Sequence, residues 1–269
     1  MDLEDDEAIF DDLHFWEAIE EEELFRLISA ESNRATVIES LRLLTPDPLW
    51  TERIIKFVEN GSVETRCVLS WLAFHLKPRN YLEIGVRRGF SMAVVARQSP
   101  KVKIYGFDKW VRRYGGVANP GSDFVRSELL KVGFRNQVQF FCGDSHCLLP
   151  LFFGKRKPNL LERIKYRHKF RNRPCEFDLM TVDGDHSLLG AYQDLSDVMP
   201  HCRIGGVVVF DDIVPPDPTR DALGELGDDP EGWGTLLGVW KEIKLKFPNF
   251  RYFEYLREPP GVGLAVRLR

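Results

Sequence analysis

The 269-residue sequence lacks the features that mark several large classes of protein. It has no apolar run near the roughly 18 residues that a membrane helix needs. Its first residues, MDLEDDEAIFDD, have neither the basic flank nor the apolar core of a signal peptide. The five cysteines include no CxxC pair, which argues against a zinc site or a disulfide framework. We therefore expect no membrane span, and a location in the reducing cytoplasm.

The chain also lacks an overall basic charge, which argues against a nucleic-acid-binding protein. Its net charge of −4 conceals two opposite blocks. Residues 2–23 contain twelve Asp or Glu and no Lys or Arg, whereas residues 155–173 contain nine Lys or Arg and one Glu. We expect these blocks to be association surfaces, within one chain or between subunits. The alternative is a solvated acidic tail and a disordered basic loop.

Helical spacing dominates the first sixty residues. Apolar side chains recur every three to five residues among the acids from Phe10 to Ile28, which predicts one amphipathic helix. Further helices are expected over 50–58 and 63–76. We assign residues 1–60 to an N-terminal helical extension. Its apolar face needs cover, so a homodimer is the expected assembly. That face comprises Phe10, Leu13, Trp16 and Ile19.

From Tyr81 onward, short apolar runs alternate with helical stretches. The expected strands are 81–85, 103–108, 138–144, 177–185 and 205–212, and the expected helices lie near 90–98, 122–132, 187–199 and 234–247. This alternation predicts an α/β domain with a parallel sheet over residues 61–269. Two further runs, 251–256 and 262–268, flank a Pro-Pro-Gly turn and predict an antiparallel hairpin at the end of the chain.

Acids and glycines follow the first three predicted strands. The first strand leads into Glu83, Gly85 and Gly89, which lack the spacing of the dinucleotide motif GxGxxG. An acid there suits an amine-bearing ligand better than a pyrophosphate. Asp108 ends the second strand, where an acid can accept hydrogen bonds from ribose hydroxyls, and Asp144 follows the third. An ordinary glycine turn and acidic helix caps are the alternative.

The fourth and fifth strands end in VDGDHS and FDD, which carry Asp183, Asp185, His186, Asp211 and Asp212. Because parallel strands end at one edge of the sheet, these carboxylates would repel one another unless a cation lies between them. Oxygen ligands favour Mg²⁺, Mn²⁺ or Ca²⁺. The sequence therefore predicts a metal site of Asp183, Asp211 and Asp212, unless these acids are helix caps or are solvated.

These strand ends together resemble those of class I S-adenosylmethionine-dependent methyltransferases. The closest resemblance is to the metal-dependent macrocin and aminocoumarin sugar O-methyltransferases and to cephalosporin-hydroxylase-like proteins. It implies a Rossmann-like seven-stranded sheet of order 3-2-1-4-5-7-6 with strand 7 antiparallel. It also implies S-adenosylmethionine and a divalent metal, with Mg²⁺ expected. The implied cofactor-binding residues are Glu83, Gly85, Gly89, Ser91, Asp108, Asp144 and Ser145.

The sequence departs from the family pattern in three places. Arg87 and Arg88 stand where a glycine is usual, and the 150–176 stretch is longer and more basic than a plain connection. His186 stands where the catechol-specific relatives carry a lysine, and Asp212 where they carry an asparagine. A sugar or natural-product hydroxyl is therefore a better expectation for the methyl acceptor than a catechol.

The expected reaction is O-methylation of a small-molecule hydroxyl, with Asp185 as the preferred base and His186 as the second choice or its orienting partner. The other histidines, His146 among them, have no paired spacing and are expected to be structural or solvated. The 213–233 loop follows the predicted metal ligands and is either a lid or a plain surface loop. Two other functions stay open: a nicotinamide-dependent oxidoreductase, and a non-catalytic binding protein with this fold.

Overall fold

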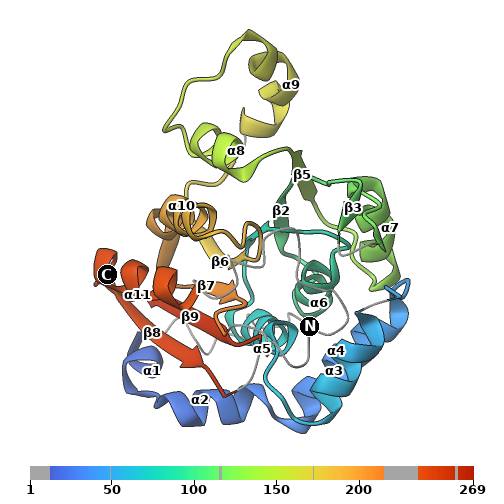
Figure 1. Ribbon diagram of the computed structural model, residues 1–269, viewed down its shortest axis with the longest axis vertical. Helices are drawn as coiled ribbons and strands as arrows, with labels where there is room; N and C mark the ends of the chain where they lie inside the picture. Colours follow the sequence, from blue (N-terminus) through green and yellow to red (C-terminus); the bar gives the residue numbers. More distant parts are fainter. Residues whose placement is uncertain (1–12, 49, 115–116, 172, 215–235, 258–259) are drawn as a thin grey trace, which may run out of the picture.

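The computed structural model describes residues 13–48, 50–114, 117–171, 173–214, 236–257 and 260–269 (Figure 1). Phe10 and nearly all of the predicted lid loop lie outside the described residues. Among the described residues, no helix combines the length and the apolar character needed to cross a membrane.

A seven-stranded sheet forms the centre of the molecule. Its strands are β1 Asn80–Ile84, β2 Lys103–Asp108, β5 Val138–Cys142, β6 Phe177–Val182, β7 Cys202–Asp211, β8 Phe250–Tyr255 and β9 Val262–Arg267. They lie in the order β5-β2-β1-β6-β7-β9-β8, and β9 is antiparallel to both of its neighbours. Counted along the chain within this sheet, the order is 3-2-1-4-5-7-6. The predicted Rossmann-like fold, strand order and terminal hairpin are confirmed. A separate two-stranded ribbon joins β3 Arg113–Tyr114 to β4 Val117–Ala118.

Helices cover both faces of the sheet (Figure 1). One face carries α5 Thr65–Leu76, α6 Phe90–Gln98 and α7 Ser122–Lys131; the other carries α8 Ser145–Phe152, α10 Leu188–Val198 and α11 Leu236–Lys246. A short 3₁₀ helix, Met199–His201, follows α10. Consecutive strand residues alternate between the two cores, as Tyr81 and Leu82 show. Burial on both faces explains why the strands appear in the sequence as continuous apolar runs.

The N-terminal extension consists of α1 Leu13–Ala18, α2 Glu21–Ile28, α3 Glu31–Leu43 and α4 Thr51–Glu59. The prediction of one continuous helix from Phe10 to Ile28 is therefore wrong, because two helices, α1 and α2, lie there. The chain is extended at Glu20, with ψ of 148°, and this break separates α1 from α2. The break turns the apolar residues of both short helices toward the same core.

The chain itself covers the described part of the extension's apolar face. Trp16 is fully buried, with its ring centroid 6.4 Å from that of Trp71 in α5 and 6.3 Å from that of Phe253 in β8. The Arg251 guanidinium donates hydrogen bonds to the carbonyls of Trp16 (2.7 Å) and Ile19 (2.6 Å). The need for cover that motivated the homodimer is thus met within one chain for these residues.

The basic segment contains a helix, α9 Leu160–Arg171. The Phe170 ring stacks on Phe141 with a centroid distance of 5.8 Å, and Tyr166 is buried beside both rings. Lys169 Nζ donates to the carbonyl of Phe140. Since β5 is an edge strand, α9 partly covers an edge that would otherwise be open to pairing.

Candidate active site

The turn after β1 depends on two glycines with positive φ. Gly85 has φ of 86°, and a Cβ there would lie 1.6 Å from the backbone oxygen of Asp183. Gly89 has φ of 76°, and a Cβ there would lie 2.5 Å from Val125 Cγ1. No other residue fits either place without movement of the backbone or its neighbours. The turn therefore brings the end of β1 directly against the loop that carries Asp183. Ser91, in the first turn of α6, is buried.

The two arginines that replace the family's glycine are directed toward the N-terminal extension. Asp47, almost fully buried between α3 and α4, places Oδ2 3.0 Å from Arg87 Nη2 and 3.6 Å from Arg88 Nε. Arg87 itself has φ of 48°. The departure from the family pattern thus has a structural purpose: it ties the turn to a residue of the extension.

Asp108, at the end of β2, links two turns at this edge of the sheet. Its carboxylate accepts backbone hydrogen bonds from Arg87, at 2.6 Å, and from Trp110. Burial raises the pKa of Asp108, and these backbone donors oppose the shift. Each carboxylate oxygen can still accept another hydrogen bond. Asp108 therefore lies at the end of β2 with room to accept further hydrogen bonds, and its predicted ribose contact stays a prediction.

Glu83 lies within β1 and is almost fully buried. Its Oε2 accepts a hydrogen bond of 2.8 Å from the Tyr81 hydroxyl, which lies 2.9 Å from Thr181 Oγ1. Burial raises the pKa of Glu83 to about 8; the Tyr81 hydrogen bond opposes the shift, and the Asp183 carboxylate adds to it. A cationic group bound nearby would stabilise the ionised form.

Asp144 and Ser145 begin α8 on the third strand end. Asp144 caps the helix by accepting a hydrogen bond of 3.0 Å from the backbone N–H of His146, and Lys109 Nζ lies 3.0 Å from its other oxygen. Partial burial acts to raise the pKa of Asp144, but the Lys109 hydrogen bond and the backbone donor hold it below its usual value. Ser145 is buried at the helix start.

His146 lies among carboxylates, which its spacing in the sequence did not suggest. Its Nδ1 is 3.3 Å from Asp144 Oδ1, and its Nε2 is 3.4 Å from Asp194 Oδ1 and 4.0 Å from Asp185 Oδ2. Asp194, in α10, is fully buried, and burial raises its pKa to about 7. Helix α10, which follows the loop with Asp183 and His186, thus contacts α8, which begins at Asp144.

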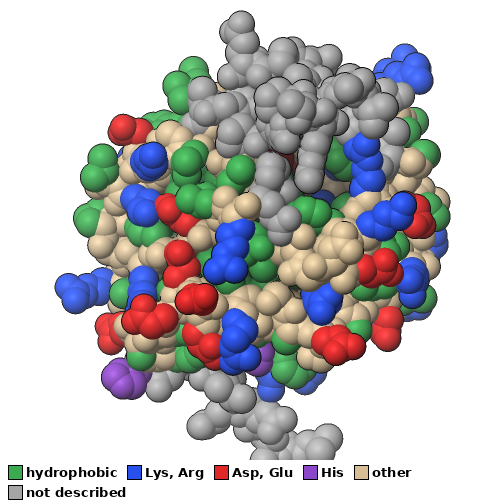
Figure 2. Space-filling view, turned by 60° about the horizontal axis from the view of Figure 1, so that its bottom comes forward, with side chains coloured by type: hydrophobic (Ala, Val, Ile, Leu, Met, Phe, Trp, Pro, Cys, Tyr) green, Lys and Arg blue, Asp and Glu red, His purple; other side chains and the backbone are tan. Residues whose placement is uncertain are grey.

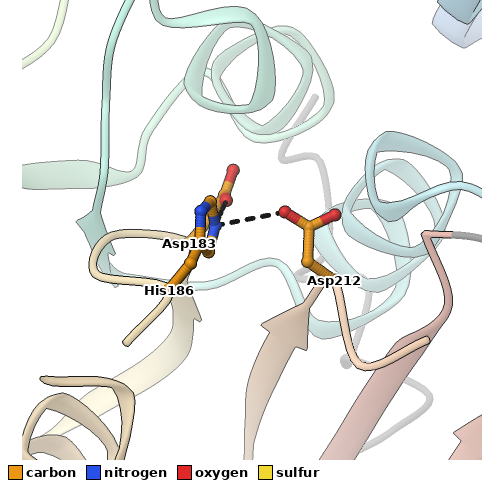
Figure 3. A group of neighbouring side chains, drawn as sticks. All are labelled: Asp183, His186 and Asp212. Atoms are coloured by element: carbon orange, nitrogen blue, oxygen red, sulfur yellow. Dashed lines mark ion pairs between the residues drawn. The ribbon is translucent and has the colours of Figure 1, made fainter. Parts of the chain in front are cut away.

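Asp183, His186 and Asp212 converge at the ends of β6 and β7 (Figure 3). His186 Nε2 lies 3.1 Å from Asp212 Oδ2 and 3.5 Å from Asp183 Oδ1. One ligand atom from each side chain lies within 4.8 Å of the other two. Burial raises the pKa of Asp183, while the His186 hydrogen bond opposes the shift. Two carboxylates and an imidazole in this arrangement could hold a metal ion.

Asp211, the third predicted metal ligand, lies outside that group. One of its carboxylate oxygens accepts hydrogen bonds from the Thr65 hydroxyl and from the backbone N–H of Asp212, the latter at 2.9 Å. Burial, followed by the charges of Asp212 and Asp183, raises the pKa of Asp211. Asp212 has φ of 59°, and its side chain points toward His186 (Figure 3). Asp211 is thus placed to support the Asp212 backbone.

Asp185 and His186, the two predicted bases, are directed to different places. Asp185 Oδ1 accepts a hydrogen bond of 2.9 Å from the backbone N–H of Ser187, and its side chain lies against Gly190 in α10. His186 instead lies with Asp183 and Asp212. The structure therefore separates two neighbours whose roles the sequence left open.

Comparison with known proteins adds a sequence match and a shared fold. Residues 82–213 match a family model described as a methyltransferase domain. Among solved structures, the chain is similar to the O-methyltransferase TomG from Streptomyces achromogenes, with TM-score 0.52 and 20% identity over 87% of this chain and 96% of that one. It is also similar to cofactor-bound Rv0187 from MTB, with TM-score 0.52 and 18% identity over 89% of this chain and 91% of that one. A search of curated proteins found no match.

The matched segment runs from β1 to just beyond β7, and so contains every strand end at which the sequence predicts a ligand. The match favours a methyltransferase over the nicotinamide-dependent oxidoreductase. With its sheet of order 3-2-1-4-5-7-6 and a methyltransferase domain matched over residues 82–213, this chain resembles the class I S-adenosylmethionine-dependent methyltransferases.

Proposed function

We propose that this protein transfers the methyl group of S-adenosylmethionine to a hydroxyl oxygen of a small molecule, such as a sugar or a natural-product intermediate, with the help of a divalent cation. The observation that carries the proposal is the group of Asp183, His186 and Asp212 beside the turn after β1. The similarity to TomG, described as an O-methyltransferase in complex with S-adenosylmethionine, supports oxygen as the methyl acceptor.

The donor atoms of this group suit a divalent cation. Two carboxylate oxygens favour Mg²⁺ or Mn²⁺, and an imidazole nitrogen shifts the preference toward Mn²⁺ and later transition metals. We therefore extend the proposed ion from Mg²⁺ to Mn²⁺. Such an ion supplies the polarisation that lowers the pKa of an acceptor hydroxyl.

The protein's own residues would bind the cofactor and align it with the acceptor. Asp108 would accept hydrogen bonds from the ribose hydroxyls, Asp144 and Ser145 would border the adenine, and Glu83 would face the cationic end of the cofactor. In the transfer, the bond from sulfur to the methyl carbon breaks as the bond from carbon to oxygen forms. Because this displacement needs an in-line approach, orientation is the main contribution of the chain.

The acceptor's proton must leave as its oxygen attacks. Asp185, which accepts a hydrogen bond from the Ser187 backbone, and His186, if it does not bind the ion, are the two candidates to receive it. As a metal ligand instead, His186 would hold the ion and leave the proton to Asp185. His186→Ala separates these roles. Loss of metal affinity identifies a ligand, while intact metal affinity with reduced turnover identifies the base.

Calorimetry and a methyl-transfer assay test the proposal together. S-adenosylmethionine should bind the metal-free protein, because its predicted contacts lie at β1, β2 and β5. Turnover of a panel of sugar and phenol hydroxyls should require Mg²⁺ or Mn²⁺ and stop in excess chelator. Full turnover in chelator would refute the metal requirement. A protein that binds the cofactor but methylates nothing in the panel would favour the non-catalytic alternative.

A further inference from the structure

The outer face of α9 is apolar and exposed. Leu160, Leu161 and Ile164 have exposed fractions of 72%, 76% and 71%. The helix stands out beyond β5 and α8 at the top of the molecule (Figure 1). Its inner side is held by Tyr166 and Phe170, so the outer side chains face away from the body as the helix is packed. Large apolar side chains gathered on an exposed, packed helix are typical of an interaction surface.

Basic residues flank this apolar face in the sequence. Lys157, Arg163 and Lys165 are exposed and have no carboxylate partner within the described part of the chain. Two neighbours, by contrast, are paired: Lys155 with Asp197 at 2.9 Å and Arg156 with Glu162 at 2.6 Å. The α9 surface, defined as Leu160, Leu161, Ile164, Lys157, Arg163 and Lys165, therefore requires a partner that is both acidic and apolar.

Residues 1–12 of the same chain have that chemistry. The segment contains seven Asp or Glu, no Lys or Arg, and the apolar residues Leu3, Ile9 and Phe10. The acids that follow in α1 and α2 are less available as a partner, since Glu23 pairs with Arg26 and Glu21 accepts a hydrogen bond from the Glu254 backbone. In Figure 2, acidic and basic side chains are interspersed over the described part of the face that comes forward from the bottom of Figure 1.

The positions of the two elements indicate which copy supplies the segment. Residues 1–12 enter the described structure at Leu13, where α1 packs on α5 and β8 near the bottom of Figure 1. The α9 surface lies at the opposite end of the longest axis. We propose that residues 1–12 of one copy bind the α9 surface of a second copy. This assembly stands independently of the proposed reaction.

Charge and burial would contribute differently to such a contact. Attraction between exposed charges is screened over about 8–10 Å near physiological salt, so it guides the encounter. Burial of Leu160, Leu161 and Ile164 against Ile9 and Phe10 would hold the complex. Reciprocal exchange closes a dimer, and one-way exchange builds longer chains. In either case the measured mass exceeds that of one 31.1 kDa chain.

Charge exchange in the full-length protein gives the sharpest test. Arg163→Glu with Lys165→Glu, or Asp5→Lys with Asp6→Lys, should each weaken self-association by about tenfold or more, measured by sedimentation velocity and light scattering. Combining both pairs should restore it, because the attraction returns with its sign reversed. Lys56→Glu with Lys101→Glu is the matched control for charge and should change little.

The apolar part has its own variant. Leu160→Asn, Leu161→Asn and Ile164→Asn together should abolish the larger species, while Leu245→Asn, at a position 78% exposed in α11, should not. A single 31.1 kDa species at every concentration, or failure of the combined charge exchange to restore association, overturns the proposal. A monomer that sediments with vesicles of phosphatidylcholine and phosphatidylglycerol through Leu160 and its neighbours would identify a lipid surface instead.

Discussion

The acids in the two halves of the sheet's carboxyl edge have different partners. In the half proposed to bind the cofactor (the cofactor half), Asp108 and Asp144 each accept hydrogen bonds from backbone N–H groups, and Asp144 also pairs with Lys109. In the half proposed to bind a metal (the metal half), Asp183 and Asp212 converge on each other and on His186, and burial raises the pKa of Asp183. The first half is already supplied with donors, whereas the second concentrates negative charge that a cation would balance.

This difference fits two separate proposed roles for the strand ends, cofactor binding and cation binding. Acids fixed by backbone donors keep their positions without a ligand and can offer their remaining lone pairs to cofactor hydroxyls. Acids that lie close together without backbone donors repel one another and destabilise the metal-free protein, and a bound cation would remove this repulsion. The contrast predicts that variants of the two halves will fail in different assays.

The largest effect is expected in the metal half. Asp183→Asn removes one of the convergent charges and one metal-binding oxygen. It should lower Mn²⁺ or Mg²⁺ affinity and turnover by at least about a hundredfold. Affinity for S-adenosylmethionine, measured by calorimetry without metal, should stay within about twofold of wild type. Asp123→Asn, on the exposed first turn of α7, is the control. Normal metal affinity in Asp183→Asn would show that Asp183 does not bind the metal.

The opposite pattern is expected in the cofactor half. Asp108→Asn keeps the shape of the side chain but removes the charge that would accept ribose hydrogen bonds. S-adenosylmethionine affinity should fall by about ten- to a hundredfold, since hydrogen bonds to charged groups contribute about 1.5–3 kcal/mol. Metal affinity should not change. Equal loss of metal and cofactor affinity would show that the two halves are not separate.

Sequence pattern was sufficient for the sheet and for the edge where the candidate site lies. Strands buried on both faces leave continuous apolar runs, and parallel topology brings their carboxyl ends together, so acids distant in sequence could be grouped without coordinates. The terminal hairpin was visible because Pro-Pro-Gly separates two apolar runs. These inferences needed only local periodicity and one rule of topology.

Contacts made by distant segments were not predictable in the same way. Asp47 reaches Arg87, and Thr65 reaches Asp211, from parts of the chain with no motif. Asp194 belongs to an ordinary amphipathic helix, so nothing in its spacing marks it as a neighbour of His146. The choice between Asp185 and His186 depended on the backbone path after Asp183, which the sequence does not specify.

Glu83 lies in β1, between the two halves, and its protonation makes the stability of the protein depend on pH. Its folded-state pKa of about 8 exceeds the ordinary 4.5, so the folded state holds a proton that the unfolded state loses first. The stability of the cofactor-free protein due to this group is therefore complete below about pH 4.5 and is lost as pH rises through about 8.

Glu83→Gln removes this titration while its amide oxygen can still accept the Tyr81 hydrogen bond. Urea unfolding of the cofactor-free proteins at about pH 6 and about pH 9 should show a smaller loss of stability in the variant. Saturating S-adenosylmethionine should narrow the gap, since its ammonium group would favour ionised Glu83. Identical pH dependence in the two proteins would place the Glu83 pKa near its ordinary value.

The smallest effect is expected at Thr65, whose uncharged hydroxyl is a hydrogen-bond donor in the metal half. The Thr65 hydroxyl donates to Asp211, whose carboxylate also accepts the N–H of Asp212 and so supports the positive φ of that residue. Thr65→Val removes the donor with little change in shape. We expect metal affinity to fall by about tenfold, less than on loss of Asp183, because Thr65 acts only through Asp211. Thr65→Ser retains the hydroxyl and should restore metal affinity, whereas a purely steric role would leave both variants weak. Cofactor affinity should be normal in both, and metal affinity equal to wild type in Thr65→Val would show that Asp211 does not position Asp212.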